Sequence, residues 1–335
     1  MIQQAIYKAL NREDLTLEET KAVMDEIMSG KATNAQIAGF ITAIRMKGET
    51  IEEITACTMI MRKYGLKLNF EGDVLDIVGT GGDEAFTFNI STISSLIISA
   101  AGVKVAKHGN RSVSSKCGSA DLLEALGVKI DIPVERSKEL LREIGICFLF
   151  APIYHSSMRY AAPVRRELGI RTIFNILGPL TNPANANLAL LGVYDEKLVE
   201  PMARVLANLG VKRAMVVHGH DGLDEISLST KTTVCEVNKG QVNSFFLDPH
   251  QFGFDYCSSE ELVGGNPDRN AEIAMGILSG EHGPKRDIVL LNSAVCLYMS
   301  YNNITLRECV KLAAKTIDSG KAMKQLNNFI RLSNV

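Results

Sequence analysis

The sequence lacks any long apolar run, because none of its 335 residues belongs to a stretch of about 18 consecutive apolar side chains. Its first residues include Lys8, Arg12, Glu13 and Asp14 in place of an uninterrupted apolar core. We therefore expect neither a membrane span nor a signal peptide, and the expected compartment is the cytoplasm.

An excess of either charge is also lacking. The chain has 36 lysines and arginines against 38 aspartates and glutamates, a formal net charge of −2. Proteins that bind nucleic acid without sequence preference need a basic surface that contacts phosphates. The balance argues against a nucleic-acid-binding function and favours small-molecule partners.

The seven cysteines lack the spacing of a disulfide framework or a zinc site. Their number is odd, their spacing is irregular and no pair forms Cys-x-x-Cys. We expect reduced and mostly buried thiols at positions 57, 117, 147, 235, 257, 296 and 309.

Residues 1 to about 65 contain signals for the starts of several helices. Three capping boxes each precede an apolar periodic run, and they are Thr16-x-x-Glu19, Thr33-x-x-Gln36 and Thr50-x-x-Glu53. After the second box, apolar residues recur at helical spacing at Ile37, Phe40, Ile41 and Ile44. This part of the chain is predicted to be helical, with a stripe that packs on another helix.

From about residue 73 the pattern changes to alternating strands and helices. Short apolar, β-branched segments lie at 74–78, 103–106, 146–150, 189–193, 214–217 and 288–291. Helical stretches lie at 91–101, 119–126, 135–144, 197–209 and 268–279. The alternation predicts an α/β fold with a mostly parallel central sheet and flanking helices. At this length, one large or two unequal domains are expected.

The segment Asp76-Ile-Val-Gly-Thr-Gly-Gly-Asp83 carries the clearest signal for a ligand site. An apolar strand delivers the chain into glycines, whose backbone N–H groups can hold an oxyanion. The segment does not fit the dinucleotide fingerprint, because position 84 is Glu, and no Gly-Lys-Ser/Thr closes a P-loop. An ordinary strand-to-helix turn is the alternative.

Asn89-Ile-Ser-Thr92 follows and is predicted to open a helix. The first turn of a helix offers unpaired N–H groups and a positive dipole end to a phosphate. Plain N-capping explains these residue types about equally well.

Lys107-His-Gly-Asn-Arg111 is predicted where a strand gives way to a loop, at the edge where open α/β sheets bind ligands. Ser114, Ser115 and Ser119 add hydroxyl donors nearby. Ser119 is also expected to N-cap the helix that Gly127 ends. A solvated basic turn is the alternative.

Asp224-Glu225 follows a third strand and a glycine-bearing loop. Magnesium binds through one or two carboxylates together with substrate phosphates, so this pair is a candidate metal site. An acidic surface turn is the alternative, and His218-x-His220 lacks a third ligand signature for a transition metal.

Taken together, these motifs resemble those of the anthranilate phosphoribosyltransferase family, in the nucleoside phosphorylase/phosphoribosyltransferase class. The resemblance covers nearly the whole chain. Its motifs are Gly79-Thr-Gly-Gly-Asp83, Asn89-Ile-Ser-Thr92, Lys107-His-Gly-Asn-Arg-Ser-Val-Ser-Ser115, Gly118-Ser-Ala-Asp121, Val164-Arg-Arg166, Arg171-Thr-Ile-Phe-Asn-Ile-Leu-Gly-Pro-Leu-Thr-Asn-Pro183 and Asp224-Glu225.

The resemblance implies two domains and a homodimer formed through the helical one. The helical domain would hold residues 1–70 with a return segment at about 165–185. The α/β domain would hold 71–164 and 186–335. The implied activity, a step of tryptophan biosynthesis, moves the phosphoribosyl group of phosphoribosyl pyrophosphate to the amine of anthranilate and releases pyrophosphate.

The resemblance also implies roles for individual residues. Those implied to bind phosphoribosyl pyrophosphate are Gly79, Gly82, Asp83, Thr87, Asn89, Ile90, Ser91, Thr92, Lys107, His108, Gly109, Asn110, Arg111, Ser112, Val113, Ser114, Ser115 and Ser119. Those implied to bind anthranilate are Gly79, Asn110 and Arg165, with His108 lining the site. Those implied to serve magnesium, as two ions, are Ser91, Asp224 and Glu225.

Lys107, Asp224 and Glu225 are expected to act electrostatically, and no residue is expected to act as an acid or base. The rival within the fold class is a pyrimidine nucleoside phosphorylase-like enzyme, which the motifs at 107–111 and 224–225 disfavour. The rival from another class is a non-catalytic nucleic-acid-binding homologue, which the charge balance disfavours.

Overall fold

The computed structural model describes residues 1–112 and 115–335. Its N-terminal region is helical, with α1 (Ile2–Leu10), α2 (Leu17–Met28), α3 (Asn34–Lys47) and α4 (Ile51–Tyr64). All three predicted capping boxes form, at the N-termini of α2, α3 and α4. The predicted stripe on α3 is buried, as expected for a helix that packs on others.

A seven-stranded sheet forms the centre of the remaining chain. Its strands are β1 (Leu75–Gly79), β2 (Val105–Gly109), β3 (Ile146–Phe150), β4 (Leu188–Gly192), β5 (Arg213–Gly219), β6 (Thr232–Asn238) and β7 (Gln241–Leu247). In space their order is β3-β2-β1-β4-β5-β6-β7. β3, β2, β1, β4 and β5 run parallel to one another, whereas β6 pairs antiparallel with both β5 and β7.

Helices cover both faces of this sheet. The helices after α4 are α5 (Ile90–Ala100), α6 (Ser119–Ala125), α7 (Val134–Glu143), α8 (Ala151–Tyr154), α9 (Ala162–Leu168), α10 (Phe174–Leu177), α11 (Val199–Asn208), α12 (Pro267–Leu278), α13 (Pro284–Ser300), α14 (Leu306–Asp318) and α15 (Lys321–Ser333), of which α9 and α10 pack on the N-terminal helices. Short 3₁₀ turns lie at η1 (Ser156–Tyr160), η2 (Gly178–Leu180), η3 (Glu196–Leu198), η4 (Pro249–Phe252) and η5 (Ser259–Leu262).

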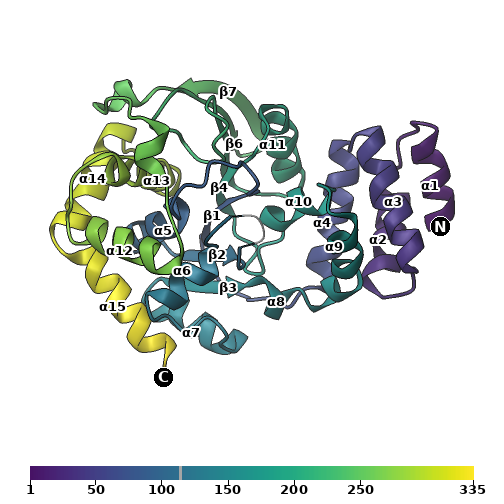
Figure 1. Cartoon of the computed structure of the whole chain (residues 1–335), viewed down its shortest axis with the longest axis horizontal. Coiled ribbons are helices and arrows are strands. Elements are labelled where there is room, and N and C mark those ends of the chain that lie inside the picture. The colour runs from purple at the N-terminus through teal and green to yellow at the C-terminus, as the bar shows by residue number, and fades with distance from the viewer. Residues whose placement is uncertain (113–114) are drawn as a thin grey trace.

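Alternate residues of β4 and β5 enter two different hydrophobic cores, because successive side chains of a strand point to opposite faces. Leu190 and Val217 join the core beneath α5 and α13, whereas Leu191 and Val216 join the core beneath α11. The second core also contains the buried residues of α1–α4. Figure 1 shows the result: α13, α14 and α15 lie on the side of the sheet away from the N-terminal helices.

The N-terminal helices contact three elements from a later part of the chain. η1 contacts α2, α9 contacts α3 and α10 contacts α4, so residues from the 156–177 region pack beside the N-terminal bundle. Arg62 of α4 donates a hydrogen bond to the carbonyl of Leu180 at 2.9 Å. The molecule thus consists of a small helical domain and a larger α/β domain with a mostly parallel sheet.

One secondary-structure prediction was wrong, and one pair of strands was missed. The segment 288–291, predicted as a strand, lies inside α13, a helix whose sides are nearly all buried. A short apolar, β-branched run cannot be told from a buried helix by periodicity alone. The antiparallel pair β6 and β7 was not predicted, although Lys239 and Gly240 have the positive φ values typical of a tight hairpin turn.

The strand predicted at 103–106 begins and ends later, as β2 at Val105–Gly109. Gly102, with φ of 106°, turns the chain out of α5, and two further residues pass before pairing with β3 begins. Lys107 and His108 therefore lie within the strand and not in the loop after it.

Two expectations from composition can also be compared with the fold. All seven cysteines are free, and six of them are buried. Within residues 1–112 and 115–335, no helix has the length and apolar character needed to cross a membrane.

Candidate active site

Four parallel strands end in glycine at the same edge of the sheet, namely at Gly79, Gly109, Gly192 and Gly219. A Cβ on Gly79 or on Gly192 would overlap Asp224, and a Cβ on Gly109 would overlap the Ser119 hydroxyl. The glycines thus allow polar groups from other segments to approach the strand ends. Open α/β sheets bind ligands at this edge.

Asp224 and Glu225 follow β5 and reach two different segments of this edge. Asp224 Oδ2 accepts a hydrogen bond from the Gly81 N–H at 2.7 Å, and Glu225 Oε1 accepts one from the Ser91 N–H at 3.2 Å. Burial, with the nearby charge of Asp83, raises the pKa of Asp224 to about 7. Burial, with the charge of Asp224, raises the pKa of Glu225 to about 8. Crowded, desolvated carboxylates of this kind favour a bound cation.

Lys107 on β2 is buried beside this carboxylate pair. Its Nζ donates hydrogen bonds to the Ile77 carbonyl at 2.6 Å and to the Ser91 hydroxyl at 3.2 Å. Burial lowers the pKa of Lys107, and the charges of Asp76 and Glu225 oppose that shift. Ser91 therefore contacts Glu225 through its backbone N–H and Lys107 through its hydroxyl.

The N-terminus of α5 has no side-chain cap from Asn89. The Asn89 amide instead donates to the Cys117 carbonyl at 3.0 Å and accepts from Asn270 at 2.9 Å. Asn89 therefore does not cap α5, and two first-turn N–H groups have other partners, since that of Ser91 donates to Glu225 and that of Ile90 donates to the Phe88 carbonyl. Asn270 was not predicted, because it lies far along the chain with no local motif.

A second network of buried hydrogen bonds, formed by Asp76 and Asn182, contacts the backbone of β2. Asp76 Oδ1 accepts from the His108 N–H at 3.2 Å, and Oδ2 accepts from Asn182 Nδ2 at 2.7 Å. Asn182 also donates to the Ala106 carbonyl at 2.7 Å. Burial raises the pKa of Asp76 to about 6. Asp76 and Asn182 both lie within motifs of the sequence, but no local pattern indicates that they meet.

The rings of His108 and His155 meet in an edge-to-face arrangement, with centroids 5.1 Å apart and an interplanar angle of 60°. Burial lowers the pKa of His108 to about 3 and that of His155 to about 4, so both rings are neutral near pH 7. Within the described part of the chain, neither Nε2 atom has a hydrogen-bond partner. His155 was not among the predicted site residues.

The segment after β2 is organised by Asp121 of α6. Asp121 Oδ2 accepts from the Ser112 N–H at 2.9 Å and from the Gly118 N–H at 2.8 Å. Arg111 donates to Glu124 at 2.9 Å, which raises the pKa of Arg111, so its guanidinium is engaged by acidic side chains. Val113 and Ser114 lie outside the described residues.

Ser119 is the first residue of α6 and not its N-cap, which is Gly118. The expected capping role was therefore wrong, because the Asp121 carboxylate already accepts the Gly118 N–H. The Ser119 hydroxyl donates to the carbonyl of Asn110 at 3.3 Å. It lies against Gly109, at the end of β2.

The glycine segment after β1 forms an irregular loop, with positive φ at Gly81, Gly82, Glu84 and Phe86. Thr87 forms an isolated bridge with Val263. This loop brings the Asp83 carboxyl group close enough to raise the pKa of Asp224.

Arg165 lies on α9, a helix that contacts α3 of the N-terminal bundle. It is half-buried, and its guanidinium carbon lies 5.3 Å from the centroid of the Phe174 ring. Burial lowers the pKa of Arg165. No salt bridge joins it to a carboxylate of residues 1–112 or 115–335, so a ligand carboxylate could pair with it.

The structure therefore brings Gly79, Ser91, Lys107, Asp224 and Glu225 together and keeps the Arg111 guanidinium on Glu124. Nowhere in the described part of the chain do three His, Cys, Asp or Glu side chains form a complete metal site. A magnesium ion at this edge would therefore need further oxygen ligands, as it does when substrate phosphates complete its coordination.

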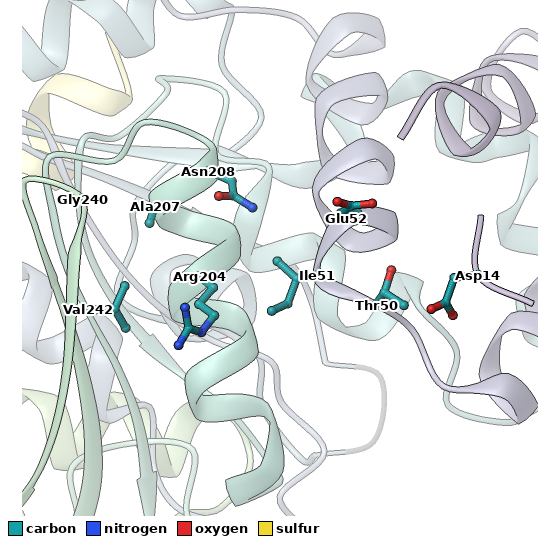
Figure 2. Close-up of a pocket in the computed structure, with 9 residues that line it drawn as sticks. All are labelled: Asp14, Thr50, Ile51, Glu52, Arg204, Ala207, Asn208, Gly240 and Val242. Atoms are coloured by element: carbon teal, nitrogen blue, oxygen red, sulfur yellow. The ribbon is translucent and has the colours of Figure 1, made fainter. Parts of the chain in front are cut away.

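A groove of about 560 Å³ lies elsewhere, between the start of α4 and α11 (Figure 2). Its lining includes Thr50, Ile51 and Glu52 on one wall and Arg204 and Asn208 on the other. It contains none of the predicted site residues, so it does not belong to the strand-end site.

Two family models cover most of the chain. The helical bundle domain of the glycosyl transferase family matches residues 3–65, and the a/b domain of the same family matches residues 71–323. Among curated proteins, the anthranilate phosphoribosyltransferase of Ruminiclostridium cellulolyticum is 69% identical over 334 residues, covering 100% of this chain and 98% of that protein.

Solved structures give the same answer. The anthranilate phosphoribosyltransferase of Thermus thermophilus matches with a TM-score of 0.93 and 43% identity, covering 99% of each chain. That of Saccharomyces cerevisiae, in complex with phosphoribosyl pyrophosphate and magnesium, matches with a TM-score of 0.90 and 30% identity, covering 99% of this chain and 98% of that one. The same yeast enzyme, in complex with 4-fluoroanthranilate, matches with a TM-score of 0.89 and 29% identity, covering 99% and 98%. The chain belongs to the anthranilate phosphoribosyltransferase family.

Proposed function

We propose that the protein transfers the phosphoribosyl group of phosphoribosyl pyrophosphate to the amine of anthranilate, giving N-(5-phosphoribosyl)anthranilate and pyrophosphate in tryptophan biosynthesis. The observation that carries this proposal is the meeting of Lys107 and Glu225 at Ser91, on the first turn of α5. A cation and a carboxylate that meet at the N-terminus of a helix suit a magnesium-bound pyrophosphate.

The phosphoribosyl pyrophosphate site would lie along the strand-end edge. Its proposed residues are Gly79, Gly82, Asp83, Thr87, Asn89, Ile90, Ser91, Thr92, Lys107, His108, Gly109, Asn110, Arg111, Ser112, Val113, Ser114, Ser115 and Ser119. Of these, Lys107 has the best support, because its ammonium is fixed by Ile77 and Ser91. Arg111 has the least, because Glu124 already holds its guanidinium.

Asp224, Glu225 and Ser91 would hold magnesium, in our proposal as two ions. The residues fit this metal, because it prefers carboxylate and hydroxyl oxygens and because the pKa of Asp224 is raised to about 7 by burial. Magnesium bound there would neutralise charge that develops on the departing pyrophosphate.

The chain's own contribution to the chemistry is electrostatic. Negative charge grows on pyrophosphate as the bond to the ribosyl carbon breaks, and Lys107 would stabilise that charge more in the transition state than in the ground state. The anthranilate amine is already a neutral nucleophile, so orientation can replace a base. No residue is assigned as an acid or base, and His108 is neutral at pH 7 because burial lowers its pKa to about 3.

The anthranilate site would combine Arg165 with Asn110 and Gly79. A guanidinium can hold a carboxylate through two parallel hydrogen bonds. His108 would line this site. Because Arg165 comes from α9 and Gly79 from β1, the two substrates would meet between the domains.

Three broader assignments belong to the same proposal. The helical domain would comprise residues 1–70 and about 165–185, with 71–164 and 186–335 in the α/β domain, a division that the contact between α3 and α9 supports. The protein would form a homodimer through the helical domain. It would work in the cytoplasm, which seven free cysteines support.

The direct test is the loss of anthranilate fluorescence when the protein is mixed with anthranilate, magnesium and phosphoribosyl pyrophosphate. We expect the loss to depend on all three additions and to match the pyrophosphate released. A folded protein that leaves the fluorescence unchanged would contradict the proposal. Phosphorolysis of a pyrimidine nucleoside by inorganic phosphate in a parallel assay would favour the nucleoside phosphorylase alternative instead.

A further inference from the structure

The loop between β1 and α5 is anchored near both of its ends. At the first end, the Thr80 N–H donates to the Gly192 carbonyl at 2.9 Å, and the Thr80 hydroxyl accepts from the Tyr194 N–H at 3.1 Å. At the second end, the Phe86 carbonyl accepts from the Gly264 N–H at 2.9 Å. The part between these anchors carries Gly82 and Asp83, two residues of the proposed phosphoribosyl pyrophosphate site.

The middle of this loop has a backbone that needs outside support. Glu84 and Phe86 have φ values of 59° and 51°, in the left-handed region that L-residues seldom adopt. Such residues persist where the surroundings hold them, and they gather at ligand sites. A contact that fixes residues 82–84 would therefore determine how the loop presents itself to a ligand.

Arg171 makes such a contact from the segment between α9 and α10. Its Nη2 donates a hydrogen bond to the Gly82 carbonyl and lies 3.6 Å from Glu84 Oε1. Gly82 has a φ of 76° and packs directly against the guanidinium. A Cβ added to Gly82 would lie 3.5 to 3.7 Å from three guanidinium atoms. One side chain thus contacts two residues of the loop.

The ring of Tyr194 packs against the Arg171 guanidinium. The Arg171 guanidinium carbon lies 4.4 Å from the centroid of the Tyr194 ring, within the range of a cation–π contact. Tyr194 is the same residue whose N–H donates to Thr80. The contacts therefore run from the first anchor of the loop, through Tyr194 and Arg171, to the middle of the loop.

Arg171 also connects the loop to the helix that carries Arg165. Gly169, in the left-handed conformation, ends α9, and Arg171 follows two residues later. This short segment reaches from the proposed anthranilate site to the proposed pyrophosphate site.

We propose that Arg171 is a positioning residue that, supported by Tyr194, holds the 79–86 loop in the conformation that binds phosphoribosyl pyrophosphate. This inference rests on the proposed function. Arg171 acts through the Gly82 backbone, and the reacting atoms lie beyond the loop. Arg171 would contribute far more to binding of phosphoribosyl pyrophosphate than to binding of anthranilate.

Steady-state kinetics on four variants test this role. We expect Arg171→Ala and Tyr194→Ala to raise the KM for phosphoribosyl pyrophosphate by about tenfold and about threefold, with the KM for anthranilate changed by less than about twofold. Arg171→Lys should recover part of the loss, because an ammonium can still donate to the Gly82 carbonyl. Tyr194→Phe should behave like the wild type, because it keeps the ring.

The matched control is Arg204→Ala, which also removes a partly exposed arginine paired with one carboxylate, Glu200. It lies on α11 beside the groove of Figure 2 and should change neither KM. Thermal unfolding of each variant identifies any that fails to fold, and Arg171→Lys and Tyr194→Phe keep the test decisive in that case.

A second measurement separates this inference from the proposed reaction. Calorimetric titration with magnesium and pyrophosphate reports on the loop without turnover, and Arg171→Ala should weaken that binding. If the wild type binds this probe in an Arg171-dependent way but consumes no anthranilate, the proposed reaction fails and the role of Arg171 stands. Unchanged binding and kinetics in Arg171→Ala would overturn it. A large loss of pyrophosphate binding in Arg171→Ala with no loss in Tyr194→Ala would also overturn it, because Arg171 would then be a direct ligand.

Discussion

Two buried lysines, one in each domain, have opposite surroundings. Lys47 in the helical domain has a 3% exposed side chain, and its Nζ lies 2.7 Å from Asp14 Oδ1 and 3.0 Å from Glu53 Oε2. Burial acts against its charge, but the hydrogen bonds to Asp14 and Glu53 outweigh burial and raise the pKa of Lys47. Lys107 in the α/β domain donates to a hydroxyl and a carbonyl, and burial lowers its pKa.

The carboxylates differ in the same way. Glu53 is fully buried, and it accepts from the Leu15 N–H at 3.0 Å and from the Thr50 N–H at 2.8 Å in addition to Lys47. Asp224 and Glu225 each accept one backbone N–H, and burial raises the pKa of both. In the first cluster, the charges of Lys47 and Glu53 are paired within the protein. In the second, each carboxylate accepts one backbone N–H, so a bound cation could supply the missing charge. Unmet charge, and not burial alone, therefore distinguishes the proposed site from the cluster of the helical domain.

The largest effect is expected from removing the incomplete cluster. Replacing Asp224 and Glu225 together by Ala should reduce magnesium-dependent turnover by at least about a thousandfold, because leaving-group charge would lose its metal ligands. The free energy of unfolding should stay the same or rise, since two crowded buried carboxylates disappear. A nearly normal rate in the fluorescence assay would refute the metal assignment.

The opposite result is expected in the helical domain. Lys47→Met should lower the free energy of unfolding by about 3 to 5 kcal/mol, because Glu53 would stay buried without its cation. Turnover of the folded fraction at low temperature should be unchanged. Denaturant unfolding measures the first effect, and the double variant Lys47→Met with Glu53→Leu should restore part of the loss. A change in the KM for either substrate in Lys47→Met would contradict the conclusion that this cluster serves stability alone.

Arg165 sharpens the comparison, because it is a third partly buried cation. Its guanidinium packs on Phe174, and burial lowers its pKa. Arg165→Ala should raise the apparent KM for anthranilate by about 10- to 100-fold and that for phosphoribosyl pyrophosphate far less. Equal effects on both constants would remove Arg165 from the acceptor site.

The smallest effect concerns pH. Because the folded pKa of Asp224, about 7, and that of Glu225, about 8, are raised, these groups favour the folded state at low pH. Their contribution to stability is fully present below the ordinary carboxyl pKa, about 4, and is lost progressively as pH rises from there through the folded values of about 7 and about 8. Magnesium competes with those protons, so its stabilising effect should grow from pH 6 to pH 9, by at least about 2 °C in the melting temperature.

Thermal melts with and without magnesium at each pH measure this difference. Asp224→Asn with Glu225→Gln should abolish it. The Lys47 cluster should not contribute, since a raised lysine pKa keeps that cation charged throughout this range. A magnesium effect that is independent of pH would argue against the two carboxyl groups as its site.

Local signals allowed most of the fold to be predicted. The capping boxes at Thr16, Thr33 and Thr50 involve residues three apart, and all three form. The error at 288–291 arose because a helix buried on all sides has the same local pattern as a buried strand. Tertiary packing around α13 decides between the two.

The site was predictable only in part, for a similar reason. Lys107 and Asp224 stand beside apolar strands in the sequence, and parallel strands bring their ends to one edge. Asn270 and Arg171 carry no such signal. Arg171 meets Gly82 across 89 residues of chain, and Asn270 meets Asn89 across 181.

The sequence by itself determined the helix starts, most of the strands, the family resemblance and which residue types gather at strand ends, because these depend on neighbours along the chain. The tertiary structure alone decided which charges are satisfied. Lys47 and Lys107 look alike in the sequence, and only folding places two carboxylates against the first ammonium and a hydroxyl and a carbonyl against the second. Desolvation and pairing are properties of three-dimensional surroundings, so they appear when distant segments meet.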